Sequence, residues 1–183
     1  MHKLGWHASD TRELSFHACA VPEGNLLGER GRGFGQFMEI LDGGRISVAS
    51  MGVGLAQGAY DLAAAYAKER QQFGRPIAEF EMIQWRLARA RTELDAARLL
   101  VHRAAALADA GLRFTDAASK AKLYASEAAT RAADSSLQVL GGYGYLQDFP
   151  IERHLRDVRL MEIGEGTSEV QRIVIARQLL RVD

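Results

Sequence analysis

The stretch EMIQWRLARARTELDAARLLVHRAAALADA, residues 81–110, decides the fold. Apolar side chains recur in it at spacings of three and four residues, and arginines occupy many of the positions between them. This period is typical of an amphipathic helix with one buried face, and Gly111 directly after it is a common helix stop. We predict a helix over 81–110 with an apolar stripe of Ile83, Leu87, Ala90, Leu94, Ala97 and Val101.

The same helical period continues on both sides of this stretch. Gly74 and Pro76 follow the preceding apolar pattern and predict its end, while Thr115 is a good N-cap for the next helix. Long amphipathic helices joined by short connections are typical of an antiparallel bundle. We therefore predict an all-α fold, an up-and-down four-helix bundle, with further helices at 34–72, 116–140, 151–156 and 168–180.

The first thirty residues differ from the rest of the chain. In ELSFHACAVP, residues 13–22, Leu14, Phe16 and Ala18 alternate with polar or small residues, which is the period of a strand. A lone strand is only marginally stable. We expect a short N-terminal β segment that either ends a sheet whose other strands lie elsewhere or packs on the helices.

Composition narrows the class of protein. The 183 residues suffice for one domain, and 48% hydrophobic with 25% charged residues is ordinary for a globular protein. The net charge of +0 argues against a nucleic-acid partner. No apolar run approaches the length of a transmembrane helix, and residues 1–10 lack the apolar core of a signal peptide. Cys19 is the single cysteine, which favours a reducing compartment, so we expect a cytoplasmic location and no membrane.

The sequence lacks the motifs of three other kinds of active site. A di-iron centre in a bundle needs two Glu-x-x-His pairs, and none of the five histidines follows a glutamate by three residues. The nucleophile elbow of serine hydrolases and the P-loop of nucleoside triphosphatases are absent as well. We expect no metal site.

A carboxylate on bare backbone is the most unusual local feature. Glu165 lies between Gly164 and Gly166, and Thr167 or Ser168 can cap the helix that follows. The glycines permit unusual dihedral angles and close approach of a flat ligand, so Glu165 could act as a general base. The alternative is an ordinary capped helix start with a solvated glutamate.

Three further segments carry alternatives of the same kind. The glycines of the 34–72 helix indicate either close helix packing or a ligand against bare backbone. In ERQQFGRP, residues 69–76, Arg70 and Arg75 suit a phosphate but also suit a helix C-terminus. QVLGGYGY, residues 138–145, is a weak phosphate signal because helices commonly end in glycine.

Taken in order, the segments LDGGRISVAS, AKERQQFGRPI, LQVLGGYGY and IGEGTSEVQRIVIARQLL closely resemble the C-terminal helical domain of the acyl-CoA dehydrogenases. SDTRELSFHACAVPEGNLLG resembles the end of that family's middle β-domain. The resemblance covers essentially the whole chain. It implies a remnant of the middle β-domain at 1–30, a C-terminal helical-bundle domain at 31–183, and two preceding parts that this sequence lacks.

The resemblance implies FAD chemistry, the α,β-dehydrogenation of an acyl-CoA thioester. Glu165 matches the catalytic base, and Gly44 occupies the position where some branched- and long-chain members carry theirs. FAD contacts are implied for Arg70, Phe73, Gln138, Gly141, Gly142, Thr167 and Glu169, with Arg70 and Phe73 reaching the FAD of a neighbouring subunit. Substrate contacts are implied for Asp42, Gly43, Gly44, Arg45 and Gly166.

The same resemblance implies a homodimer or homotetramer, and electron transfer flavoprotein as the electron acceptor. The alternative is a flavin-free helical fragment or oligomerisation module, inactive by itself, because the parts that normally contact the flavin ring lie outside this sequence.

Overall fold

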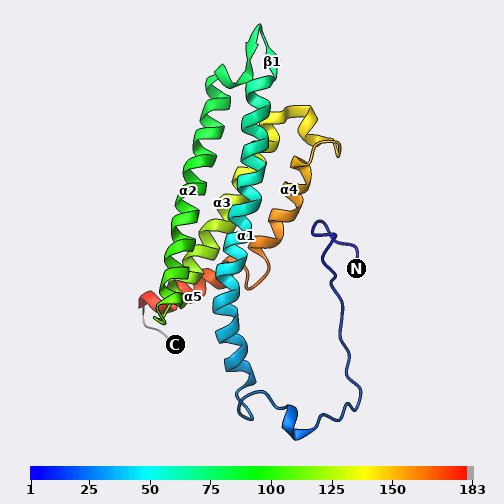
Figure 1. Ribbon diagram of the computed structural model, residues 1–183, viewed down its shortest axis with the longest axis vertical. Helices are drawn as coiled ribbons and strands as arrows, with labels where there is room; N and C mark the ends of the chain where they lie inside the picture. Colours follow the sequence, from blue (N-terminus) through cyan, green and yellow to red (C-terminus); the bar gives the residue numbers. More distant parts are fainter. Residues whose placement is uncertain (181–183) are drawn as a thin grey trace.

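The computed structural model describes residues 1–180 of the 183-residue chain. Three long helices run up, down and up along one axis, and two shorter helices follow (Figure 1). A two-stranded antiparallel hairpin joins the first two long helices. The elements are α1 (Gly33–Glu69), β1 (Gln71–Gln72), β2 (Arg75–Pro76), α2 (Glu81–Asp109), α3 (Thr115–Leu140), α4 (Ile151–Val158) and α5 (Ser168–Leu180).

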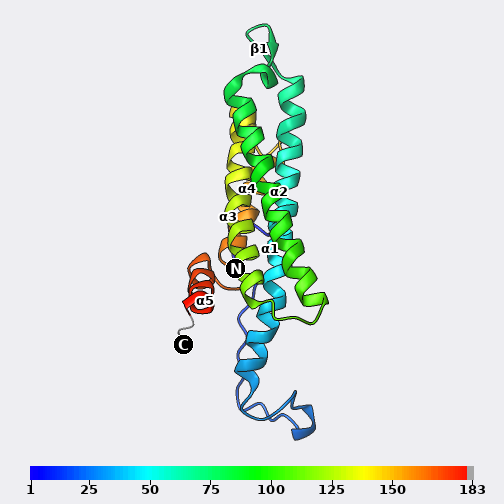
Figure 2. The ribbon, with the colours of Figure 1, turned by 90° about the vertical axis from the view of Figure 1, so that its left-hand side faces the viewer.

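Helix α3 is the centre of the arrangement, since it packs against α1, α2, α4 and α5. Figure 2 shows α5 beside the lower end of α3. The all-α prediction is confirmed, and the predicted helices agree with the observed ones to within three residues at their ends. The fourth side, against α1 and α3, is formed by α4, which has only eight residues. No helix in the described range 1–180 is both long and apolar enough to cross a membrane.

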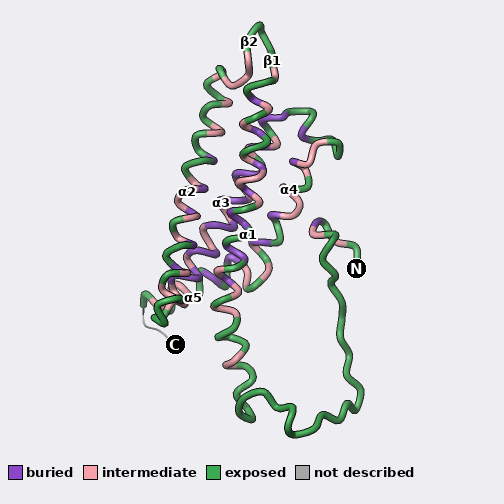
Figure 3. The backbone as a smooth tube through the Cα atoms, in the orientation of Figure 1, coloured by how far each residue is buried: buried purple, intermediate pink, exposed green. Residues whose placement is uncertain are grey.

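The core is made mostly of alanine. Buried residues line the inward faces of the long helices from Arg45 onward in α1 and from Ala90 onward in α2, whereas the first turns of α1 are largely exposed (Figure 3). Small side chains let helix axes approach closely, which explains how three slender helices exclude water from their common interior. The fully covered alanines include Ala49, Ala56, Ala59, Ala63 and Ala67 on α1, and Ala118, Ala121 and Ala133 on α3.

Close helix packing explains some of the glycines of α1. A Cβ on Gly52 would lie 3.6 Å from the carbonyl oxygen of Ala125 and 3.7 Å from the Cβ of Ala129, so this glycine serves helix packing. A Cβ on Gly43 or Gly54 would meet no atom within 4 Å. Close packing therefore accounts for Gly52 but not for every glycine in the helix.

The β1–β2 hairpin replaces the last turn of the predicted 34–72 helix. Helix α1 ends at Glu69, and Phe73 and Gly74 both have positive φ, 53° and 80°. Two consecutive residues of this kind form the tight turn that matches the twist of a two-residue hairpin. The hairpin extends the chain beyond the end of the bundle (Figure 1).

The predicted N-terminal β segment is wrong. Residues 1–32 contain no strand, and the side chains of Leu14 and Phe16 are 77% and 78% exposed. A strand needs a partner for its backbone hydrogen bonds, and within residues 1–180 no other strand lies beside this segment. The segment is instead attached to α4, where the backbone N–H and indole Nε1–H of Trp6 donate to Asp157 at 2.6 Å and 2.8 Å.

Candidate functional site

The residues 164–167, here called the Glu165 turn, connect η4 (Arg159–Glu162) to α5. Glu165 has φ +55° and Gly166 has φ +90°, so two successive residues adopt the left-handed conformation that is uncommon for a side-chain-bearing residue. The Glu165 side chain is exposed and lies across α1. Its Oε2 is 2.7 Å from the position that a Cβ on Gly44 would occupy. Glycine at position 44 therefore leaves the room that the carboxylate fills.

Two buried side chains hold the backbone of this turn. Lys122 on α3 donates from Nζ to the carbonyl oxygen of Gly166 at 2.7 Å. Gln171 on α5 donates from Nε2 to the same oxygen at 3.0 Å and to the carbonyl oxygen of Glu165 at 3.3 Å. Neither Lys122 nor Gln171 exposes any surface to solvent. The backbone that carries the carboxylate is therefore held by hydrogen bonds from two helices, α3 and α5.

Thr167 caps helix α5, which confirms one of the two predicted capping residues. Its Oγ1 accepts the backbone N–H of Val170 at 3.4 Å, whereas Oγ of Ser168 is buried and has no partner in the described chain. The pKa of Glu169 is lowered because its carboxylate accepts its own backbone N–H and the Thr167 hydroxyl. Negative charge is stabilised at this helix N-terminus.

Asp42 and Arg45 form an internal pair rather than a free polar patch. Arg45 is buried, and its Nη1 donates to Asp42 Oδ1 at 2.5 Å. The hydroxyl of Thr115 donates to the other oxygen, Oδ2, at 2.6 Å. The prediction that Thr115 caps α3 is therefore wrong, since Phe114 is at the cap position and the Thr115 side chain reaches across to α1. This cluster ties the beginning of α3 to the helix turn that carries Gly44.

A second group of predicted residues meets at the other end of the bundle. Arg70, Gly141 and Gly142 line an open cavity of about 440 Å³, the hairpin-end cavity, together with Tyr66 and Tyr143. The guanidinium carbon of Arg70 lies 5.5 Å from the centre of the Tyr143 ring. Arg70 makes no ion pair with any carboxylate of residues 1–180, so its charge is available to a ligand. A Cβ on Gly141 or Gly142 would touch nothing within 4 Å, which leaves bare backbone facing open space.

Phe73 and Gln138 do not join this cavity. Phe73 is at the tip of the hairpin, 92% exposed, with its ring 6.0 Å from that of Phe80. Gln138 is exposed in the last turn of α3, where its carbonyl accepts the backbone N–H of Gly141. The structure therefore brings Arg70 to the glycines at 141–142 but leaves these two side chains pointing outward.

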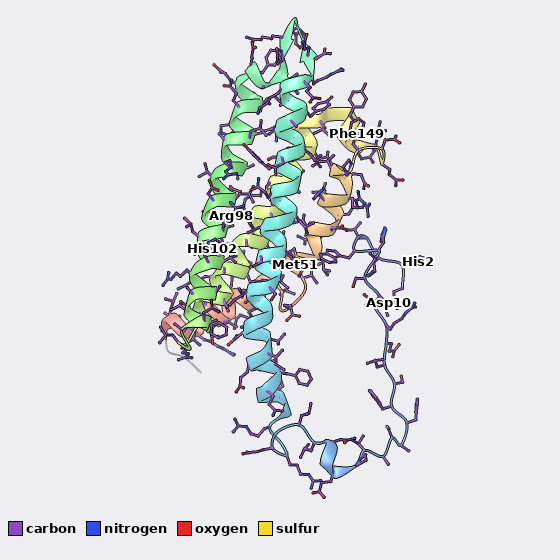
Figure 4. All side chains as sticks on the ribbon, in the orientation of Figure 1. His2, Asp10, Met51, Arg98, His102 and Phe149 are labelled. Atoms are coloured by element: carbon purple, nitrogen blue, oxygen red, sulfur yellow. The ribbon has the colours of Figure 1, made fainter. Side chains whose placement is uncertain are left out.

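The two groups are far apart. Gly44 and Glu69 are 25 residues apart on α1, roughly 37 Å at 1.5 Å per residue. In Figure 4, Phe149, whose ring packs 5.3 Å from that of Tyr143, lies far above Met51 on the same view of the molecule. The predicted residues thus form a carboxylate end and a cavity end. No group of three or more metal-ligating side chains occurs in the described residues.

Comparison with known proteins decides the family. The family model for the C-terminal domain of acyl-CoA dehydrogenase matches residues 31–180. The chain belongs to the acyl-CoA dehydrogenase family. Among curated relatives of this family, a probable acyl-CoA dehydrogenase of Bacillus subtilis, YngJ, is 54% identical over 179 residues, which are 98% of this chain and 47% of that protein.

Solved structures also match this chain. The butyryl-CoA dehydrogenase of Megasphaera elsdenii superposes with a TM-score of 0.98 at 44% identity, covering 99% of this chain and 47% of that one. A structure described as the electron transferring flavoprotein of Acidaminococcus fermentans also gives 0.98, at 47% identity, over 100% of this chain and 48% of that one. The chain spans about half the length of the curated relatives it matches.

Sequence reasoning missed Lys122, Gln171 and Tyr143. The signal for Lys122 was present, because it lies in register with Ala118 and Ala125 on the buried stripe of α3. A lysine on such a stripe needs a specific partner inside the fold. In this acyl-CoA dehydrogenase domain the partner is the backbone of the Glu165 turn.

Proposed function

We propose that this chain is the C-terminal domain of an FAD-dependent acyl-CoA dehydrogenase and that Glu165 is its catalytic base. The observation that carries the proposal is the position of Glu165: an exposed carboxylate on a restrained turn, facing bare backbone at Gly44. A general base needs access to the substrate and a fixed approach to it, and this arrangement supplies both.

The chemistry divides between the chain and its cofactor. Glu165 takes the proton from the α-carbon of the acyl thioester, and the backbone N–H of the same residue stabilises the charge that develops on the thioester oxygen. A bound FAD would supply the hydride acceptor for the β-carbon, and the product would be an α,β-unsaturated thioester. Gly166 presents bare backbone next to the base, so a flat acyl chain can approach it closely.

The cavity end suits a part of the FAD of a neighbouring subunit, because it lies roughly 37 Å from the carboxylate end of the same chain. The pyrophosphate of FAD is an anion whose oxygens a guanidinium can bind through paired hydrogen bonds. Arg70 has no ion pair with a carboxylate within residues 1–180 that would compete with this contact. Gly141 and Gly142 offer backbone to the same anion. We propose that Gln138 flanks this contact and that Phe73, exposed on the hairpin, reaches the FAD of a neighbouring subunit.

At the carboxylate end we propose that Thr167 and Glu169 contact the flavin nucleotide and that residues 42–45 contact the CoA part. Gly43 is exposed and Gly44 lies under Glu165, so their backbone is the accessible portion. Asp42 and Arg45 hold each other, and they contribute by fixing this turn of α1.

For the organisation of the chain we propose residues 1–30 as the remnant of a middle β-domain and 31–183 as the helical-bundle domain, whose last three residues lie outside the described part. Helix α4 would be the fourth member of an up-and-down bundle. A homodimer or homotetramer would cover exposed apolar side chains, such as Trp85 and Leu99 on α2. Electron transfer flavoprotein is the proposed electron acceptor, and the lone Cys19 supports a cytoplasmic location.

The test is flavin retention followed by substrate addition. The chain is incubated with FAD and desalted, and butyryl-CoA is added without oxygen, because the butyryl-CoA dehydrogenase of M. elsdenii makes a short acyl chain the first choice. We expect a flavin absorption band that bleaches. Glu165→Gln should keep the band and lose the bleaching, while Glu39→Gln, an exposed carboxylate on α1, should behave as the parent chain does.

If the chain alone retains no flavin, the measurement is repeated with the N-terminal half of the M. elsdenii enzyme supplied as a separate chain. Absence of flavin in that mixture would contradict the enzyme proposal. It would support the alternative, a flavin-free helical fragment or oligomerisation module.

A further inference from the structure

Lys122 is the largest fully buried side chain of the described residues, and no solvent reaches it. A lysine is seldom buried without a partner, because its ammonium group loses its hydration. Its Nζ donates to the Gly166 carbonyl at 2.7 Å, across 44 residues of sequence. The full burial also means that Lys122 cannot touch a substrate, so any role in a reaction must act through its neighbours.

The segment that Lys122 contacts has an unusual backbone. Glu165 and Gly166 both have positive φ, and residues with side chains rarely adopt this conformation. Such a conformation persists only where the surroundings impose it. Gln171 supplies the second constraint, since it donates to the carbonyl oxygens of both residues. A carbonyl oxygen has two lone pairs, so the Gly166 carbonyl accommodates both donors.

The conformation of the turn decides where the Glu165 carboxylate lies. In the observed state Oε2 occupies the space above Gly44. Rotation of the Gly166 peptide would shift the backbone on which Glu165 is carried, and the carboxylate would leave this position. Lys122 comes from α3, so its hydrogen bond ties the turn to the helix that packs against α1, α2, α4 and α5.

We propose that Lys122 is a positioning residue: by holding the Gly166 carbonyl, it keeps the Glu165 turn left-handed and the carboxylate over Gly44. The catalytic meaning of this role rests on the proposed function of Glu165. The structural role does not, and it can be measured in the chain without flavin.

Charge around Lys122 is consistent with this role. Burial lowers the pKa of its ammonium group, while the carboxylates of Glu162, Glu169 and Glu127 raise it and Arg45 lowers it further. Both the ammonium and the neutral amine carry protons that can be donated, so the hydrogen bond to Gly166 survives either state.

The test compares Lys122→Met with Lys120→Met in the full chain. Methionine is unbranched and fills a similar space but donates no hydrogen bond. Lys120 is on the same helix, and its partly exposed Nζ pairs with Asp116, so its substitution controls for loss of a lysine from α3. Hydrogen–deuterium exchange is followed in peptides spanning 163–171, together with cleavage after Glu165 by a glutamate-specific protease.

We expect Lys122→Met to accelerate exchange and cleavage at the turn by roughly tenfold or more, with peptides from α1 and α2 protected as in the parent chain. Lys120→Met should leave the turn unchanged. Parent-like exchange at 163–171 in a folded Lys122→Met chain would overturn the proposal.

If Lys122→Met does not fold, the parent chain is examined by NMR with labelled lysine. Slowly exchanging Nζ protons close to the Gly166 α-protons are expected, and rapid exchange would overturn the proposal.

In flavin-loaded protein, Lys122→Met should lower kcat while leaving KM unchanged. Faster exchange at the turn with no activity even in the parent protein would refute the function of Glu165 but not the role of Lys122.

Discussion

The carboxylate of Glu165 lies against Gly44 of α1, with Oε2 2.7 Å from the point where a Cβ on Gly44 would be. The two residues are 121 positions apart in the chain. Glu165 has a left-handed backbone, and Gly44 is a glycine within a long helix. The carboxylate fills the space that the missing side chain at position 44 leaves.

Gly44→Ala tests this relationship. The added methyl would meet only the end of the Glu165 side chain, which can rotate away, and alanine favours the helix by about 1 kcal/mol over glycine. We expect a stable protein in which the rate of flavin reduction by butyryl-CoA falls roughly tenfold, a barrier increase of about 1.4 kcal/mol. Gly54→Ala is the control, since its Cβ would meet nothing within 4 Å. Equal rates in both variants would show that the carboxylate does not need this position.

Arg70→Lys tests the cavity end. Lysine keeps the charge but loses the planar fork and the stacking on Tyr143, so we expect FAD to bind roughly tenfold more weakly. Arg75→Lys is the matched control, because Arg75 stacks on Phe80 of the hairpin region and does not line the cavity. The measurement is titration of FAD fluorescence, and identical dissociation constants for the two variants would exclude Arg70 from the FAD contact.

Much of the fold could be predicted from sequence because periodicity reports directly on burial. The stripe from Ile83 to Val101 predicted α2 to within one residue at its end. The alternation at Leu14 and Phe16 predicted an N-terminal strand that the structure lacks. A strand depends on a partner strand, and the described chain has none beside this segment. The Phe73–Gly74 turn was missed because phenylalanine is an unusual choice at a position with positive φ.

The candidate site was predictable only in part, and for a physical reason. The spacing around Glu165 predicted accessible backbone, and Thr167 as a cap followed from local chemistry. The contacts of Lys122 with Gly166, and of Thr115 with Asp42, depend on how helices far apart in sequence cross. No local pattern encodes such a crossing, so these residues emerge only from the three-dimensional arrangement.

Asp42→Ala should destabilise the fold strongly. Arg45 is buried, and loss of Asp42 would leave its charge without a partner, which typically costs about 3 kcal/mol. For a chain of this size that corresponds to a fall in Tm of roughly 6–12 °C. Asp61→Ala, which removes an exposed carboxylate bonded only to Gln57, should change Tm by far less. Similar Tm values for the two variants, measured by circular dichroism, would contradict the importance of the buried pair.

Because of Lys122, the free energy of unfolding is expected to rise with pH in the alkaline range. Burial lowers its pKa in the folded chain from the ordinary value of 10.5. Between the lowered pKa and 10.5 the unfolded chain therefore binds more protons, and the free energy of unfolding rises with pH. Below the lowered pKa both states are protonated and the dependence disappears.

Urea unfolding at several pH values measures this effect. The difference in unfolding free energy between the parent chain and Lys122→Met should grow in favour of the parent as pH approaches 10.5. A difference that stays constant with pH would show that the folded environment does not disfavour the ammonium form.

The alanine-rich interior sets the direction in which this domain is vulnerable to mutation. Of the 25 buried apolar residues in the described part, 16 are alanine. Truncation of an alanine removes only a methyl group, so cavities created by mutation destabilise this core little. Replacement of a buried alanine by a larger residue is more damaging, because the larger side chain must separate two helices, which costs about 1–3 kcal/mol. Drift during evolution is therefore expected to spare these positions and to accumulate on the outer faces of α1 and α2.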